Sequence, residues 1–379
     1  MSEDVSGADT PRRNQSRPTP LHAVHVALGA SMTDFAGWSM PLRYTSELAE
    51  HHAVRNAAGL FDLSHMGELV LTGPGAAAAL DHALVGNIGK LAVRRARYTM
   101  ICDADGGVLD DLIVYRLGAQ EYMVVANAAN TAVVMAALTE RVAGFDTELR
   151  DATDDYALVA LQGPRAVELL APLTDADLGS LKYYASAPAT VAGHPVLLAR
   201  TGYTGEDGFE LFCSPDDAES LWQALRAAGG PEVPLPAGLA CRDSLRLEAG
   251  MPLYGNELTA ERTPFEAGLG RVVKFDKGDF VGRDALLARA ESGPRETLVG
   301  LVGRGRRAPR AGYPVVDPAT GAALGVVTSG APSPTLGKPV AMAYVPLDRA
   351  EPGTELAVDV RGRQEPVDVV ALPFYRREA

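Results

Sequence analysis

Cysteine is scarce in this sequence. The three cysteines, Cys102, Cys213 and Cys241, stand far apart, and no Cys-x-x-Cys pair occurs. An odd, scattered set of this kind excludes a disulfide framework and gives no zinc-binding spacing. We therefore expect three buried, reduced thiols.

Long apolar runs and an excess of basic charge are also missing. No stretch approaches the roughly 20 apolar residues that cross a bilayer, so no membrane association is predicted. Acidic residues outnumber basic ones by 48 to 35, which gives a net charge of -13. That balance argues against nucleic acid as a partner, because phosphate neutralisation needs a basic face. Residues 1–20 are polar and rich in proline. They lack the apolar core of a secretory signal, so we expect a flexible tail and a cytoplasmic protein.

The region from residue 21 to 290 mixes helix-like and strand-like segments, which indicates an α+β architecture. We expect a helix from about Ser46 to Gly59 and another over 128–142, with strands over 68–71, 97–102, 108–117 and 121–126. An apolar strand, Gly-Pro and a helix occur twice, at 68–84 and at 156–173. We interpret this as a repeated unit whose proline stands in the first helical turn.

After residue 291 the pattern becomes all-β. Five short β-branched runs alternate with Gly/Pro turns over 297–374, and no helical periodicity is visible. This predicts a C-terminal β-barrel or sandwich domain at 295–375, joined by a linker at 292–294 to a region at 21–290 built from two intertwined subdomains.

Several motifs of well-known chemistry are incomplete. Gly73-Pro-Gly75 resembles a dinucleotide fingerprint, but no acidic residue follows at the required distance. Asp103-Ala-Asp105-Gly106 resembles a calcium loop, but Val114 occupies the position of the essential glutamate. The histidines show no metal-ligand spacing, and Gly-x-Ser-x-Gly is absent. We therefore expect no metal, no nucleotide cofactor and no serine hydrolase.

Three other segments carry more chemistry. Asp110 and Asp111 begin an apolar strand, where side-chain alternation directs one carboxylate outward and the other inward. The inward carboxylate needs an arginine or another donor, although a surface acid beside a turn is an equally good interpretation. The glycine-rich segment 200–210 places Tyr203 and Glu210 where the backbone can approach a flat ligand. Arg242 and Arg246 lie four apart on one helical face.

Taken together, these segments resemble the aminomethyltransferase (T-protein) family of the glycine cleavage system. The motifs occur in the family order and cover the chain from about residue 20 to 375. They are Asp34-Phe-Ala-Gly-Trp38, Phe61-Asp-Leu-Ser-His-Met-Gly67, Gly106-Gly-Val-Leu-Asp-Asp111, Asn127-Ala-Ala-Asn130, the 200–210 segment, Gly238-Leu-Ala-Cys-Arg-Asp243 with Arg246-Leu-Glu248, Pro264-Phe-Glu-Ala-Gly-Leu269, and Thr328-Ser-Gly330 with Ser333-Pro-Thr-Leu-Gly337.

The resemblance implies a three-domain cloverleaf and a specific reaction. Lipoylated H-protein would present an aminomethyl group, and tetrahydrofolate would accept its methylene carbon as ammonia and the dihydrolipoyl arm leave. The P- and L-proteins of glycine cleavage would be indirect partners.

The resemblance also implies a set of site residues. Asp111 would be the acid at the reaction centre, with Arg242 beside it and Glu210 on the pterin. The remaining folate contacts that it implies are Tyr203, Asn127, Tyr98 and Met66.

Those residue types suit the chemistry. A carboxylate can hold the folate amine and stabilise the cation that forms, and an arginine paired with it would keep it ionised. Proton transfer by Asp111 and a purely electrostatic role both remain open.

One residue departs from the family pattern. Arg271 stands where relatives often carry tryptophan. Either it contacts the glutamate tail of the ligand or the aromatic contact is lost, and the sequence leaves both open.

Two alternatives to an aminomethyltransferase are compatible with parts of this pattern. A related folate-dependent demethylase shares the motifs, although a flavin-linked form would need a preceding domain. A folate-binding accessory protein for iron–sulfur assembly would carry a Lys-Gly-Cys-Tyr run, which does not occur here.

Overall fold

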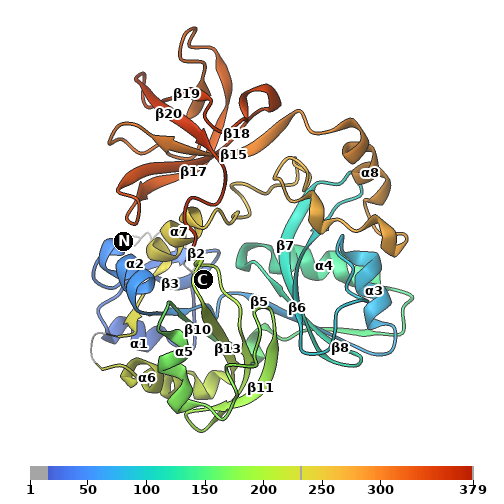
Figure 1. The fold of residues 1–379 in the computed structure, drawn as a ribbon. Helices are drawn as coiled ribbons and strands as arrows, with labels where there is room; N and C mark the ends of the chain where they lie inside the picture. Colours follow the sequence, from blue (N-terminus) through green and yellow to red (C-terminus); the bar gives the residue numbers. More distant parts are fainter. Residues whose placement is uncertain (1–15, 231–232, 378–379) are drawn as a thin grey trace, which may run out of the picture.

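The computed structural model describes residues 16–230 and 233–377 and forms three lobes around a common centre (Figure 1). Two lobes are β-sheets covered by helices, and the third is a closed barrel drawn in orange and red. The predicted α+β fold with a C-terminal barrel is thus confirmed. The limits at 21–290 and 295–375 stay a prediction. Among the described residues, none of the helices is long and apolar enough to cross a membrane.

The two helix-covered sheets contain most of the strands before residue 240. The first sheet has six strands, in the spatial order β11 (Ser186–Val191), β12 (His194–Ala199), β13 (Gly208–Cys213), β10 (Ala157–Gln162), β4 (Gly59–Asp62) and β14 (Leu235–Pro236). The second has five antiparallel strands, in the order β6 (Ala96–Cys102), β7 (Val108–Gly118), β8 (Glu121–Ala126), β5 (Gly67–Thr72) and β9 (Glu148–Asp151). Because β4 and β5 belong to different sheets, the chain crosses between the sheets at residues 63–66.

Side-chain alternation on these strands builds three apolar layers. Leu69 and Leu71 pack under helices α3 (Ala76–Ala83) and α4 (Thr131–Val142), whereas Val70 between them faces the other sheet. Val159 likewise packs toward α6 (Ala218–Ala227), whereas Leu158 faces the layer between the sheets. The sheets therefore lie face to face with helices outside, and the layer between them is the one that positions the site.

The helices cover the outer faces of the sheets or connect the lobes. They are α1 (His22–Ala27), α2 (Glu47–Asn56), α3 (Ala76–Ala83), α4 (Thr131–Val142), α5 (Ala166–Leu170), α6 (Ala218–Ala227), α7 (Leu239–Glu248) and α8 (Arg283–Ser292). The expected helix near residue 46 begins as predicted, because the Ser46 hydroxyl accepts the backbone N–H of Ala49 at 3.1 Å and caps it.

The repeated strand–turn–helix unit is present as β5–α3 and β10–α5, with one correction. Pro74 and Pro164 do not stand in the first helical turn; each precedes the residue that caps its helix. The Gly73-Pro-Gly75 turn is shaped by packing, since a Cβ atom on either glycine would lie 2.7 Å from the backbone of Asp146. Its glycines allow close approach of two chain segments.

The barrel contains one strand that the sequence pattern did not reveal. Its order is β15 (Glu296–Gly303), β18 (Lys338–Pro346), β17 (Ala323–Ser333), β16 (Pro314–Val316), β19 (Glu355–Asp359) and β20 (Gln364–Val370), closed by pairing of β20 with β15. The unpredicted strand is β16. The linker follows α8, and Gly293 there adopts a φ of 71°.

The N-terminal part of the described chain is more ordered than the sequence suggested. Residues 1–15 of the predicted tail lie outside the described residues. Residues 16–20, in contrast, are part of the fold: β1 (Arg17–Pro18) pairs with β3 (Trp38–Arg43), which also pairs with β2 (Ser31–Phe35). Thr19 is buried and donates a hydrogen bond to Asp62 at 2.7 Å.

Candidate active site

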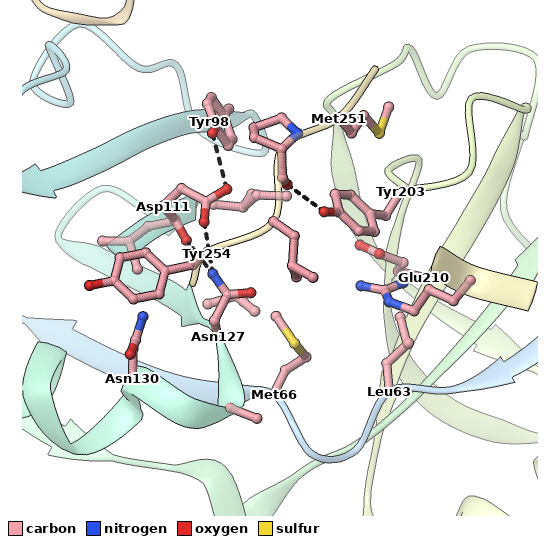
Figure 2. A pocket seen from close by; sticks show the side chains of 18 of the residues that line it. Leu63, Met66, Tyr98, Asp111, Asn127, Asn130, Tyr203, Glu210, Met251 and Tyr254 are labelled. Carbon is pink, nitrogen blue, oxygen red and sulfur yellow. Dashed lines mark hydrogen bonds between the residues drawn. The ribbon is translucent and has the colours of Figure 1, made fainter. Parts of the chain in front are cut away.

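A cavity of 380 Å³ lies between the two helix-covered sheets. Strands β6, β7 and β8 line one side, β10 and β13 line the other, and the crossing segment 63–66 and the loop 250–254 complete the walls. Figure 2 shows polar side chains gathered at two places in it, around Asp111 and around Glu210. Apolar groups such as Leu63 and Met66 separate these places.

The paired aspartates on β7 point to opposite faces, as alternation requires. Asp111 lines the cavity, while Asp110 is completely buried behind it. The expectation that one aspartate faces solvent is therefore wrong. Asp110 instead accepts three hydrogen bonds from amide groups: the Asn127 backbone N–H at 3.0 Å, the Asn127 Nδ2 at 2.8 Å and the Asn130 Nδ2 at 2.8 Å. The turn at η1 (Ala128–Asn130) brings these amides together.

Asp111 is held by neutral donors. The Tyr98 hydroxyl donates to Asp111 Oδ2 at 3.0 Å, and Asn127 Nδ2 donates to Asp111 Oδ1 at 2.9 Å (Figure 2). Arg242 forms no ion pair with Asp111 among the described residues, contrary to our expectation of an arginine partner. The Asn127 amide thus bridges the two carboxylates, one on each face of the sheet.

Burial raises the pKa of both aspartates. The pKa of Asp111 rises to about 6 because the surroundings disfavour its charge, although the Tyr98 and Asn127 hydrogen bonds act in the opposite direction. The pKa of Asp110 rises to about 7 through burial and the neighbouring Asp111 charge. Two linked carboxylates titrate as a pair, and the pair carries at least one negative charge at neutral pH.

Glu210 lies on β13 at the far wall of the cavity. It accepts hydrogen bonds from the Thr201 hydroxyl and from the Tyr115 hydroxyl, the latter at 3.3 Å. Burial raises the pKa of Glu210, and the positive charge of Arg242 partly counteracts that effect. The carboxylate is therefore fixed in place while one edge remains open to a ligand.

Arg242 projects from α7 into the same wall. Its guanidinium carbon lies 4.6 Å from the centre of the Tyr203 ring, a cation–π distance. The Tyr203 hydroxyl in turn donates to the Pro252 carbonyl, which fixes the ring. The guanidinium has no hydrogen-bond acceptor among the described residues. Its five donors are consequently free to meet an acceptor on a bound molecule.

The seven site residues named from the sequence all line this cavity. They are Met66, Tyr98, Asp111, Asn127, Tyr203, Glu210 and Arg242. The structure shows where these residues lie, and their roles stay predictions. Arg271 is not among the lining residues; it is exposed, two residues after Leu269, which does line the cavity.

Several polar or aromatic groups of the site were not named as site residues from the sequence. Asn130 holds Asp110, and Tyr115, Tyr254 and His65 line the cavity. The signal for Asn130 was available, because Asn127-Ala-Ala-Asn130 repeats an amide at a spacing of three after a strand. His65 lies inside the quoted motif at 61–67 but was not singled out within it, and no pattern pointed to Tyr254. In the described part of the chain, no group of three or more His, Cys, Asp or Glu residues could hold a metal ion.

The site thus combines a central cavity, a largely buried carboxylate with a raised pKa, and an arginine without an acceptor among the described residues. Comparisons with known proteins name the family. The GCVT N-terminal domain family model matches residues 21–277, and the glycine cleavage T-protein C-terminal barrel domain matches residues 297–376.

Curated relatives and a solved structure agree with those matches. An aminomethyltransferase of Saccharopolyspora erythraea is 67% identical over 364 residues, covering 96% of this chain and 99% of the relative. One from Streptomyces avermitilis is 66% identical over 370 residues, with 96% and 99% covered. The crystal structure of glycine cleavage system aminomethyltransferase T from Bartonella henselae superposes with a TM-score of 0.89 at 37% identity, covering 95% of this chain and 98% of that one. The chain therefore belongs to the aminomethyltransferase family of glycine cleavage T-proteins.

Proposed function

We propose that the protein transfers the methylene carbon of an aminomethyl group, carried on the lipoyl arm of H-protein, to tetrahydrofolate. The observation that carries this proposal is the cavity between the sheets, where Asp111 and the Arg242–Glu210 wall face one enclosed space. Its volume of 380 Å³ falls within the range of small-molecule sites. The family membership supplies the reaction type.

The proposed reaction balances without an oxidant or a metal. The methylene carbon starts bonded to the sulfur of the lipoyl arm and to an amine. It ends bonded to the N5 and N10 atoms of the folate. The two protons that these nitrogens lose appear on ammonia and on the released thiol. H-protein is the partner that this scheme requires, and the P- and L-proteins would act before and after it.

Asp111 is placed to serve the cationic part of this reaction. Carbon–nitrogen cleavage passes through a positively charged species, and a carboxylate in a low-dielectric cavity stabilises it. Because Tyr98 and Asn127 fix both carboxylate oxygens, the charge needs no reorganisation during the reaction. With a pKa raised to about 6, Asp111 is mostly ionised at neutral pH and also basic enough to accept a proton.

The opposite wall would hold the pterin. Glu210 can accept hydrogen bonds from the 2-amino and N3–H groups of that ring, while Thr201 and Tyr115 orient it. Arg242 would supply donors to ring acceptors, and Tyr203 supports the guanidinium from below its plane. Met66 contributes an adaptable apolar contact between the two polar places.

The deciding experiment measures ammonia and 5,10-methylenetetrahydrofolate produced from aminomethyl-lipoyl H-protein, with and without tetrahydrofolate. We expect folate-dependent ammonia release. We also expect Asp111→Asn to lower turnover by roughly 10²-fold or more while folate affinity changes little, because the variant keeps its shape but loses its charge.

Asp105→Asn is the matched control, since Asp105 is exposed in the turn before β7. Its turnover should equal that of the unmodified protein. Retained turnover in Asp111→Asn would contradict the assigned role. Tight folate binding without any ammonia release would contradict the proposed reaction itself.

A further inference from the structure

His65 lies in the segment where the chain crosses from one sheet to the other. It lines the cavity and is only 3% exposed. No function described above uses it, and it belongs to no metal-ligand group. Its position between Leu63 and Met66, which also line the cavity, brings it to the wall of the site.

The imidazole of His65 lacks internal hydrogen bonds. Its Nδ1 atom is sealed from solvent and has no partner, and no hydrogen bond within the described residues reaches Nε2. Buried polar groups are nearly always paired, so an unpaired ring at a cavity wall needs a physical reason. Because Nδ1 is inaccessible to solvent, Nε2 is the ring nitrogen that can form a hydrogen bond with a bound molecule.

The backbone around His65 is firmly held. The Ser64 N–H donates to Asp62 Oδ1 at 2.9 Å, and the Ser64 hydroxyl accepts the Leu158 N–H at 3.1 Å. Asp62 is itself fixed by His25 at 2.8 Å. The Phe35 ring, another cavity residue, meets the imidazole edge to face at 5.5 Å between ring centres. The ring is therefore oriented in advance of binding.

The protonation of this ring follows from its surroundings. Burial and the nearby Arg242 charge lower the pKa of His65 to about 4, so the imidazole is neutral at physiological pH. A buried N–H without an acceptor costs more than an unpaired lone pair. The favoured tautomer therefore leaves the lone pair on sealed Nδ1 and carries the proton on Nε2. His65 is then a hydrogen-bond donor just after β4, which lies two strands from the Glu210 strand β13 in the same sheet.

We propose that His65 is a substrate-binding residue whose Nε2–H donates to the 4-oxo group of the bound pterin. The inference rests on the proposed function, in which Glu210 binds the 2-amino and N3–H edge. On the pterin ring the 4-oxo oxygen is adjacent to N3–H, so a donor near Arg242 and Glu210 meets that oxygen. His65 thereby selects a 4-oxo pterin over a 4-amino one.

The test measures dissociation constants by calorimetry for 5-formyltetrahydrofolate and its 4-amino-4-deoxy analogue. The full-length protein is compared with His65→Phe, which keeps an aromatic ring without donors, and with His65→Gln, whose amide can place a donor near Nε2. His52→Phe is the matched control because His52 is exposed on α2. For the 4-oxo ligand we expect a Kd about tenfold higher in His65→Phe than in the unmodified protein. The Kd of His65→Gln should stay within about threefold of the unmodified value, and that of the control should not change.

The analogue separates binding from a structural role. The unmodified protein should bind the 4-amino ligand more weakly, because its ring lacks both the 4-oxo acceptor and the N3–H group that would donate to Glu210, and His65→Phe should not weaken that binding further. Equal weakening of both ligands by His65→Phe, or an unchanged Kd with a lower melting temperature, would overturn the proposal. If His65→Phe does not fold, His65→Leu, which also lacks a donor, is compared with the unmodified protein on the same two ligands. Failure of the unmodified protein to bind any folate would instead refute the proposed function.

Discussion

The two arginines of helix α7 show how one helix serves two regions of the molecule. Arg242 and Arg246 stand one turn apart and project from neighbouring positions on one face. Arg242 enters the cavity, where it finds a tyrosine ring but no acceptor within the described structure. Arg246 enters the junction between the helix and the barrel and is 1% exposed.

Every part of the Arg246 guanidinium is paired. It donates to Asp243 at 2.7 Å, to Glu257 at 2.9 Å and to the hydroxyl of Ser329 on the barrel at 2.8 Å. The Glu257 carboxylate also accepts the Leu253 N–H at 2.9 Å, which anchors the loop that borders the cavity. The Arg246 charge at the junction therefore has hydrogen-bond partners within the protein, whereas the Arg242 charge at the cavity has none among the described residues.

This contrast separates stability from function. A buried charge with a full set of partners holds the fold together, because removing it leaves its partners unpaired. A buried charge without partners destabilises the ligand-free protein, and a ligand that forms hydrogen bonds with it can offset this destabilisation.

Arg246→Met should lower the free energy of unfolding by about 3–5 kcal/mol, because Glu257, which is 0% exposed, would remain as an uncompensated charge. Urea denaturation measures the change. Arg242→Met is the matched control and should shift stability by no more than about 1 kcal/mol. Equal destabilisation by both variants would remove the distinction between the two regions.

Arg242→Met should have the larger effect on catalysis. Losing preorganised donors in an enclosed site lowers kcat/KM by about 10²–10³-fold. Folate-dependent ammonia release measures it, with the thermal melting curve showing that the fold is intact. A kcat/KM close to that of the unmodified protein would show that the unpaired guanidinium contributes little to the site.

The two regions should also respond to pH in opposite directions. The pKa of Asp111 is raised to about 6, so activity that needs its charge falls about tenfold between pH 7 and pH 5. A raised acid pKa also means that the cavity gains stability as the pH falls through that range.

At the junction, burial alone would raise the pKa of Glu248, but hydrogen bonds from His51, Ser333 and Thr335 lower it to about 2. Its stabilising contribution is therefore present above about pH 4.5 and is lost as the pH falls toward 2. Activity profiles and circular dichroism at the same pH values would separate the two effects. Parallel loss of structure and activity near pH 6 would contradict them.

Ser329→Ala should give the smallest effect. It removes one acceptor from Arg246 and one from Asn256 Nδ2, whose distance to the hydroxyl is 3.1 Å. We expect a loss of about 1.5 kcal/mol, measured by urea denaturation, with unchanged kcat. A double-mutant cycle with Arg246→Met should show strong coupling, and additive effects would place Ser329 outside the junction network.

Strands and helices were predictable from the sequence wherever the local residue pattern is strong. Strands such as β8 and the long β7 were predicted within a residue or two, because alternation and turn residues define them locally. Strand β16 was missed because it has only three residues, and its pairing depends on β17 and β19 rather than on its own composition. The ordered residues 16–20 were missed for the same reason.

The sequence predicted which residues line the site, but not which of them form hydrogen bonds with one another. Motif resemblance named Asp111 and Arg242, and residue type suggested that they form an ion pair. The structure instead gives Asp111 the Tyr98 hydroxyl and the Asn127 amide. Tyr98 reaches it because β6 pairs with β7, and Asn127 because β8 ends beside it. Such pairing depends on strand register across the sheet, which single-residue patterns do not encode.

The end of the chain also belongs to the junction. After the barrel closes, the chain returns to α7, where the Tyr375 N–H donates to the Glu248 carbonyl at 2.8 Å. The Arg55 guanidinium lies 4.0 Å from the centre of the Tyr375 ring. The barrel is thus attached to α7 at two places, through Ser329 on β17 and through the segment that follows β20. Removing the residues from Tyr375 onward would leave only the Ser329 contact of this pair, so we expect the barrel to be held less firmly against α7.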